Sequence, residues 1–172
     1  KPRVLSSFYV SILTAFVATV INTVMGLILA WVLVRYKFPG KRIMDGMIEI
    51  PFALPTAVAG ISLTSLTSDT GVLGSFFGHF GIKIAYTRLG IIVALIFVGI
   101  PFVVRAVQPV LEKLDGSYEE AARVMGAKRS VIFWRVVFPE LKPALFAGAG
   151  LAFGRCLGEY GSVVFIAGNK PY

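Results

Sequence analysis

The sequence contains very few of the side chains that build disulfides, metal sites and catalytic centres. Its 172 residues include one cysteine, Cys156, and one histidine, His79. One cysteine cannot form an internal disulfide, and this pair cannot form the Cys/His cluster of a zinc site. The sequence also lacks a Walker-type phosphate-binding loop, so we expect this chain not to hydrolyse ATP itself. The composition therefore argues against an enzyme and predicts no metal or cofactor.

Charged residues are also scarce. They make up 15% of the chain, whereas hydrophobic residues make up 56% and the mean hydropathy is +0.81. A soluble domain has about a quarter charged residues, so the expected solvent for this much apolar surface is a lipid bilayer. The net charge of +8 does not indicate nucleic acid, because the basic residues lie between apolar runs without the aromatic interleaving of an RNA-binding patch.

Four apolar stretches are long enough to cross a membrane. They are residues 8–34, 47–67, 89–108 and 143–168. At about 1.5 Å per residue, each reaches across a hydrocarbon core of about 30 Å. A helix satisfies its own backbone hydrogen bonds in that core. The sequence therefore predicts an all-α, polytopic membrane bundle with four spanning helices.

The basic residues predict the orientation of these helices. Four Lys and Arg residues lie in 35–46 and seven in 105–142, against five in the segments on the other side, 1–7, 68–88 and the C-terminal end. Lys and Arg accumulate in cytoplasmic loops, so 35–46 and 109–142 are predicted to be cytoplasmic. The N-terminus is then predicted to lie outside, which we expect only if another span precedes residue 1.

The longest predicted cytoplasmic segment, 112–142, is polar at first and then amphipathic. Ser117 and Glu120 have the spacing of a capping box, with Ser117 as the N-cap. This spacing predicts a short helix over 118–125. Gly126 is placed to end that helix in the left-handed conformation.

A second short helix is predicted over 128–137. Pro139 should end it, because proline cannot continue a helical hydrogen-bond ladder. Its face, which includes Phe133 and Trp134, is too apolar for free solvent. We expect it to lie against the membrane interface or the spanning helices.

This segment contains Glu120-Ala121-Ala122, three residues, Gly126, nine residues, and then the run 136–139, which ends at Pro139. The spacing resembles the EAA loop of ABC-importer permeases, with Val and Phe in place of the family's Ile and Leu before the proline. The resemblance implies that Glu120, Ala121, Ala122, Gly126 and Pro139 form a coupling element that docks on a separate ATPase. The alternative is a loop helix that only contacts lipid headgroups.

Further segments resemble the sulfate/molybdate branch of these permeases. They are 31–36, 49–60 and 158–162, and the strip 158–169 is most similar to the sulfate/thiosulfate permeases. The resemblance implies ATP-driven import of sulfate or thiosulfate across the bacterial inner membrane. A molybdate or tungstate permease is the alternative, and a passive anion channel or a secondary transporter would be a different class.

The same resemblance implies partners and a longer protein. The partners are an ATP-binding ABC ATPase, a second homologous permease subunit and a periplasmic or lipid-anchored sulfate-binding protein, in addition to membrane lipid. Full-length relatives have six spans, so we expect residues 1–172 to be a permease domain truncated at both ends.

Arg155 and Glu159 are ionisable residues inside the predicted fourth span, four positions apart on one helix face. Charges inside a span are costly and face the bundle interior or a water-filled cavity. Two interpretations stay open: an ion pair that fixes packing, or a transport-pathway role in which Arg155 attracts the anion. Gly150, Gly154 and Gly158 form a small-residue stripe beside them, a predicted packing face whose partner the sequence leaves open.

Pro51, Pro55 and Pro101 interrupt the second and third predicted spans. Each proline removes a helical hydrogen bond, and such breaks are tolerated where backbone lines a cavity or is covered by protein. The three prolines are therefore candidates for simple kinks or for lining the transport pathway. Glu49 and Arg105 are expected to reach water at the cytoplasmic interface.

Overall fold

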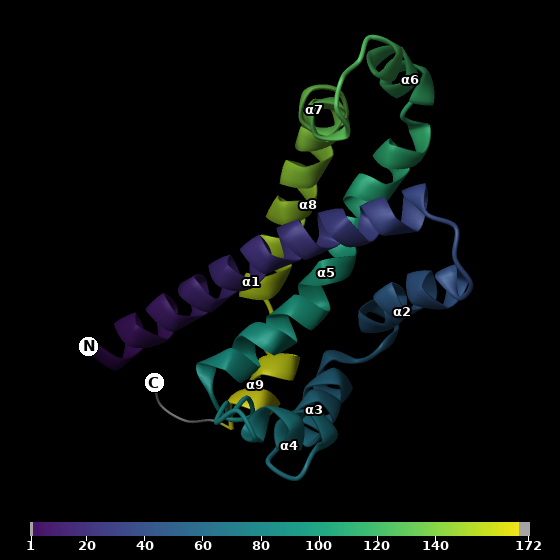
Figure 1. The fold of residues 1–172 in the computed structure, drawn as a ribbon. Helices are drawn as coiled ribbons and strands as arrows, with labels where there is room; N and C mark the ends of the chain where they lie inside the picture. Colours follow the sequence, from purple (N-terminus) through teal and green to yellow (C-terminus); the bar gives the residue numbers. More distant parts are fainter. Residues whose placement is uncertain (1, 169–172) are drawn as a thin grey trace.

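The computed structural model describes the backbone of residues 2–168 and the side chains of residues 5–168, and within this part all the regular structure is helical. The helices are α1 (Pro2–Arg35), α2 (Lys41–Ala53), α3 (Thr56–Thr67), α4 (Val72–Gly78), α5 (Arg88–Lys113), α6 (Gly116–Val124), α7 (Arg129–Ile132), the π-helical turn η1 (Phe133–Val137), α8 (Phe138–Leu157) and α9 (Gly161–Ala167). Helix α5 runs through the centre and packs against both α1 and α8 (Figure 1). The predicted all-α class is confirmed.

Three helices in the described part are long and apolar enough to cross a membrane: Leu5–Arg35, Arg88–Lys113 and the continuous stretch Arg129–Leu157. A fourth crossing exists only if α2 and α3 are counted as one broken span, bent by 116°. Residues 47–67 are therefore not one continuous helix, and the break lies at one of the two prolines that were predicted to interrupt this span. Its cause is Pro55, which pushes the residue before it out of the helical region; Leu54 has φ −89° and ψ 136°.

The predicted boundaries of the last span are wrong at both ends. Pro139 does not end a helix, because it lies in the first turn of α8, and the π-helical turn before it continues the chain with a Phe138 N–H that bonds to the Phe133 carbonyl. At the other end, α8 stops at Leu157 and α9 begins only at Gly161. Residues 143–168 therefore contain most of α8 and all of α9, with a break between them, and are not one continuous helix.

The core lies along the contacts of α5 with α1 and α8. One cluster of fully buried side chains joins these helices near the α6 end, and it includes Leu33, Val103, Val107 and Leu141. At Gly148 the backbones of α8 and α5 approach closely, since a Cβ there would lie 2.9 Å from the Ala106 Cβ. A larger side chain at position 148 would push the two helices apart.

The predicted small-residue stripe does not pack within the described part of the chain. A Cβ on Gly150 or Gly154 would meet no atom within 4 Å. Large apolar neighbours on α8 are also exposed, among them Phe146 at 76% and Leu151 at 60%. This face of α8 is open to lipid or to another subunit.

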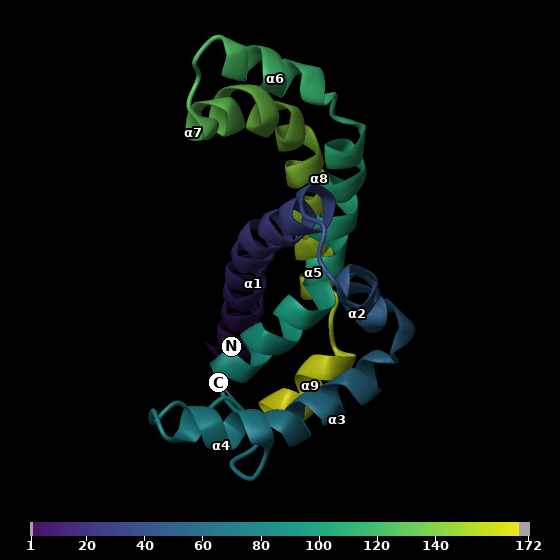
Figure 2. The same ribbon diagram turned by 45° about the vertical axis from the view of Figure 1, so that its right-hand side comes forward.

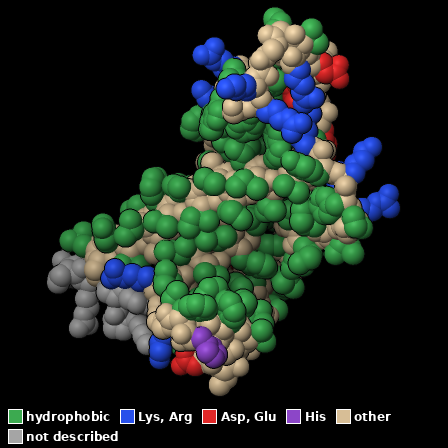
Figure 3. All heavy atoms as spheres, in the orientation of Figure 1, with side chains coloured by type: hydrophobic (Ala, Val, Ile, Leu, Met, Phe, Trp, Pro, Cys, Tyr) green, Lys and Arg blue, Asp and Glu red, His purple; other side chains and the backbone are tan. Residues whose placement is uncertain are grey.

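The outer surface separates apolar from basic side chains. Hydrophobic side chains cover α1 and the middle of the molecule, while Lys and Arg gather around α6, α7 and the connection from α1 to α2 (Figure 3). Helices α6 and α7 lie at one end, and α3, α4 and α9 lie at the opposite end (Figure 2). The basic end is the one that the charge distribution predicts to be cytoplasmic.

Candidate functional site

Helix α6 begins earlier than predicted and uses a different cap. Its N-cap is Asp115, whose side chain accepts a hydrogen bond from the backbone N–H of Ser117 at 2.9 Å. The predicted capping box of Ser117 with Glu120 is therefore wrong. A carboxylate is a strong N-cap because its charge also meets the positive end of the helix. The hydrogen bonds from Ser117, backbone first and side chain second, hold the pKa of Asp115 below its ordinary 3.8.

Helix α6 ends as predicted, at Gly126. This residue has φ +81°, which favours glycine. The N–H of Gly126 bonds to the Arg123 carbonyl at 2.9 Å and that of Ala127 to the Ala122 carbonyl at 3.0 Å. These two bonds form a Schellman motif, so α6 is a short rigid element that is capped at both ends.

The motif residues of α6 divide between two faces. Ala122 is buried, whereas Glu120 and Ala121 are exposed. The end of the helix exposes two apolar side chains almost completely, Val124 at 89% and Met125 at 80%. An apolar tip on a helix that projects from the bundle is typical of a surface that a partner covers.

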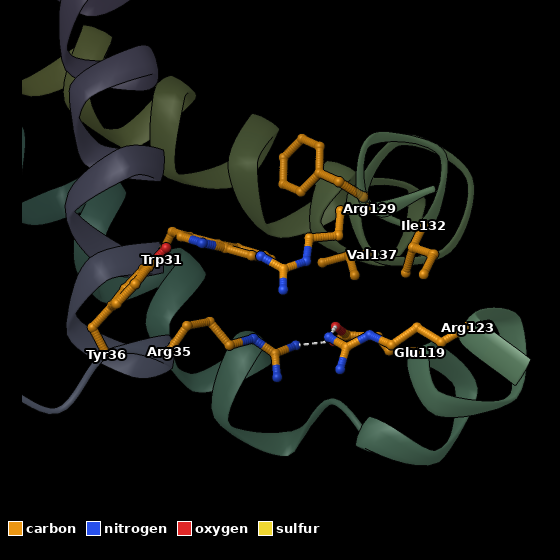
Figure 4. A pocket seen from close by; sticks show the side chains of 9 residues that line it. Trp31, Arg35, Tyr36, Glu119, Arg123, Arg129, Ile132 and Val137 are labelled. Atoms are coloured by element: carbon orange, nitrogen blue, oxygen red, sulfur yellow. Dashed lines mark hydrogen bonds and ion pairs between the residues drawn. The ribbon is translucent and has the colours of Figure 1, made fainter. Parts of the chain in front are cut away.

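Glu119 attaches α6 to the rest of the molecule, and the sequence analysis missed it. It is buried, its carboxylate forms an ion pair with Arg35 at the end of α1, and Arg123 lies 3.9 Å from its second oxygen. Figure 4 shows Glu119 together with the guanidinium groups of Arg35 and Arg123, and a dashed line joins Arg35 to the carboxylate. The signal was the helical spacing, because Glu119 shares the face of the buried Ala122 and Glu120 does not.

These residues line a cavity of about 350 Å³ between the end of α1, α6 and α7. Three arginines, Arg35, Arg123 and Arg129, contribute guanidinium groups to it (Figure 4). Trp31 closes one side, with its ring against that of Phe133 at 5.2 Å and the Arg35 guanidinium 5.3 Å from its centre.

A second set of ion pairs ties α2 to α5. Arg105 on α5 lies 2.8 Å from Asp45 and 2.8 Å from Glu49, both on α2, and donates to Gln108 at 2.6 Å. Arg105 and Glu49 were expected to reach water at the interface, and their ion pair was not predicted; the two side chains are 28% and 59% exposed. Asp45 was not among the predicted residues. Its position four residues before Glu49 on a helix would have indicated a two-carboxylate face.

Arg155 and Glu159 form the predicted ion pair, with 2.6 Å between Nη1 and Oε2. Glu159 does not lie on the same helix as Arg155, because α8 ends at Leu157. Its Oε1 accepts hydrogen bonds from the backbone N–H and the hydroxyl of Ser162, at 2.9 and 3.0 Å. Glu159 thus joins the end of α8 to the first turn of α9, and its side chain is 1% exposed against 32% for Arg155.

The two interrupted spans meet at their breaks. A Cβ on Gly161, which begins α9, would lie 2.2 Å from the Thr56 hydroxyl, at the start of α3. Pro55 precedes Thr56 and marks the break, while Pro51 lies inside α2. Pro101 is buried inside α5 without a break. Of the three prolines that the sequence singled out, only Pro55 lies between two helices. Pro51 and Pro101 lie inside helices, and Pro101 belongs to a different span.

This arrangement defines a class of protein: a polytopic helical membrane protein with a short capped helix that projects from one end. A comparison with protein families gives the same class. The model of the binding-protein-dependent transport system inner membrane component matches residues 6–171, and the chain belongs to that family.

Curated relatives are similar over almost the whole chain. The "Sulfate transport system permease protein CysT" of Salmonella typhimurium is 56% identical over 169 residues, which are 98% of this chain and 61% of the relative. The protein of that name from Escherichia coli K12 is 55% identical over 169 residues, which are again 98% of this chain and 61% of the relative. A "Probable sulfate transport system permease protein cysT" of Chlorokybus atmophyticus is 54% identical over 100% and 60%. The chain thus spans about 60% of the length of these relatives.

Proposed function

We propose that this chain forms part of a permease subunit of an ATP-driven importer of sulfate or thiosulfate in the bacterial inner membrane. The family supports the transport class. The names of relatives at 54–56% identity support sulfate over molybdate. In this proposal the chain moves the anion and a separate ATPase subunit hydrolyses ATP.

Helix α6 is the proposed contact for the ATPase. The observation that carries this proposal is a helix capped at both ends, with Glu120, Ala121 and an apolar tip exposed and its opposite face held to the bundle. A rigid helix with small side chains on its free face suits insertion into a groove on a partner. Val124 and Met125 are apolar side chains exposed at the tip, and a partner surface would remove them from water.

Two connections carry a displacement of α6 into the membrane. The ion pair of Glu119 with Arg35 links it to the end of α1. The turn at Gly126 leads into the continuous stretch from α7 through Pro139 to the end of α8. A push on α6 therefore acts on two spanning helices at once.

The broken spans are the proposed pathway. Pro55 and the Glu159 link place two backbone breaks side by side, and non-helical backbone at membrane depth is tolerated where it lines a cavity or is covered by protein. Arg155 is partly exposed and paired with Glu159, and in this proposal the rest of its guanidinium group offers N–H donors there to a passing anion. Pro51 and Pro101 take the role of shaping α2 and α5 around it.

The remaining proposed partners follow from the family. The family description names a binding protein, which in this proposal is periplasmic or lipid-anchored and delivers sulfate to the end formed by α3, α4 and α9. The open face of α8 at Gly150 and Gly154 suits a second homologous permease subunit. Membrane lipid covers the rest of the apolar surface.

The test is sulfate uptake into proteoliposomes that contain the full-length protein assembled with its ATPase and the second permease subunit, supplied with the sulfate-binding protein. Ala121→Trp should abolish ATP-driven uptake, because it adds bulk to the proposed docking face. Ile12→Trp is the control, since it adds bulk to an apolar position of α1 that is 52% exposed and that the proposal leaves to lipid. Equal uptake by the two variants would contradict the docking role of α6.

The same vesicles separate the other candidate functions. Uptake without ATP would indicate a passive channel or a secondary transporter. Competition by molybdate that is stronger than competition by thiosulfate would indicate a molybdate permease.

A further inference from the structure

The arginine-lined cavity between α1, α6 and α7 has more positive charge than its own carboxylate neutralises. Glu119 is the one acidic side chain among its lining residues, against Arg35, Arg123 and Arg129. Arg129 makes no ion pair with any carboxylate in the described part of the chain. The cavity thus presents a surplus of positive charge at the basic end of the molecule.

Hydrogen-bond donors are also left over. Arg129 is exposed and has no carboxylate partner among the described residues, so its N–H groups are open to a ligand. Because the planar guanidinium group matches phosphate oxygens, arginines are suited to such an anion.

The cavity continues into an apolar stripe on α1. Val24, Ile28, Trp31 and Arg35 follow one another at spacings of four, three and four residues, so they share one face of the helix. Val24 and Ile28 are 54% and 50% exposed. Trp31 lies at the boundary between this stripe and the cavity, where aromatic residues mark the headgroup level of a membrane.

We propose that this cavity binds the phosphate of an anionic phospholipid, such as phosphatidylglycerol, from the leaflet at the basic end of the molecule. Arg35 and Arg129 bind the phosphate oxygens, and one acyl chain runs along Ile28 and Val24. The apolar stripe favours a lipid over a carboxylate of the ATPase. An acyl chain would cover Val24 and Ile28, whereas a carboxylate side chain in the cavity would leave them exposed. The lipid then bridges the end of α1 and the start of α7, the two elements that flank the attachment of α6.

The test uses the complete transporter, purified, delipidated and titrated with phosphatidylglycerol or with phosphatidylcholine of the same acyl chains, with bound lipid counted by native mass spectrometry. Arg129→Gln should weaken phosphatidylglycerol binding about fivefold, the effect of one basic residue at a membrane surface. Arg129→Lys should keep most of the affinity. Arg135→Gln is the matched control, because Arg135 is exposed in η1 and does not line the cavity.

Other outcomes would overturn the proposal. Equal loss in Arg129→Gln and Arg135→Gln would show a diffuse charge effect and no site. Full displacement of the lipid by millimolar inorganic phosphate would show a site for free anions. Unchanged lipid affinity together with loss of the ATPase from Arg129→Gln would assign the cavity to the protein interface.

Discussion

Replacing Glu119 by Gln should loosen α6 from the end of α1. The change removes a carboxylate that faces Arg35 and Arg123 and keeps the size of the side chain. It also leaves three guanidinium groups around one cavity without a counter-charge. Both effects favour states in which α6 is detached.

The magnitude follows from the burial of the ion pair between Arg35 and Glu119. Exposed pairs contribute up to about 1 kcal/mol, and removing one partner of a buried pair costs about 3–5 kcal/mol. The side chains of Arg35 and Glu119 are 26% and 12% exposed, so their pair lies between these limits. We expect a cost of about 2 kcal/mol, which is roughly a 30-fold increase in the detached population.

Hydrogen exchange of the backbone amides of α6 measures this population in the full-length protein without requiring transport. Glu119→Gln should speed exchange roughly 30-fold. Glu120→Gln, the neighbouring exposed carboxylate, should leave it unchanged, and Arg35→Gln should have a smaller effect because Arg123 still faces Glu119. Equal exchange in Glu119→Gln and the wild type would refute the attachment.

Three further predictions concern the ends of α6 and the broken spans. Gly126→Ala should destabilise the end of α6 by about 1–2 kcal/mol, because φ +81° crowds a Cβ; unchanged exchange of the Met125 and Ala127 amides, which donate to carbonyls in α6, would contradict this. The pKa of Asp115 is lowered in the folded state, so its stabilisation is complete above about pH 4 and is lost as the pH falls below that. Protection of the first turn of α6, corrected for intrinsic exchange, should therefore fall only under acid conditions, and it should fall less in Asp115→Asn. Arg155→Ala should lower sulfate uptake more than membrane abundance, since the guanidinium is partly exposed beside the breaks; equal losses of both would leave Arg155 a packing role only.

The sequence predicted the parts of the fold that follow from local patterns. Long apolar runs predicted α1 and α5, because their length and composition leave few alternatives to a spanning helix. Gly126 predicted the end of α6, since few residues other than glycine adopt its conformation. The charge distribution predicted which end gathers the basic side chains.

The errors arose where one local signal competed with another. Ser117 and Asp115 can both cap a helix. Asp115 is the observed N-cap, because its negative charge is also stabilised by the helix dipole and because α6 is then longer. Pro139 should have ended a helix, but the π-helical turn accommodated it. Gly158 and the Glu159 contact with Ser162 split a run that was apolar enough to be read as one span.

The candidate site was predictable in its sequence motif and not in its attachments. Glu120, Ala121 and Ala122 are recognisable from spacing alone. The pairs of Arg35 with Glu119 and of Arg105 with Asp45 join residues 84 and 60 positions apart. Nothing local marks such pairs, because they depend on how the helices pack.

The central claim is that an ATPase acts on α6. The most direct measurement places a photo-crosslinking amino acid at Ala121 of the full-length protein in the assembled, transport-active complex. The account predicts a crosslink to the ATPase subunit, and none from the same probe at Ser75. A crosslink from position 121 to lipid alone, in a complex that still imports sulfate, would contradict it.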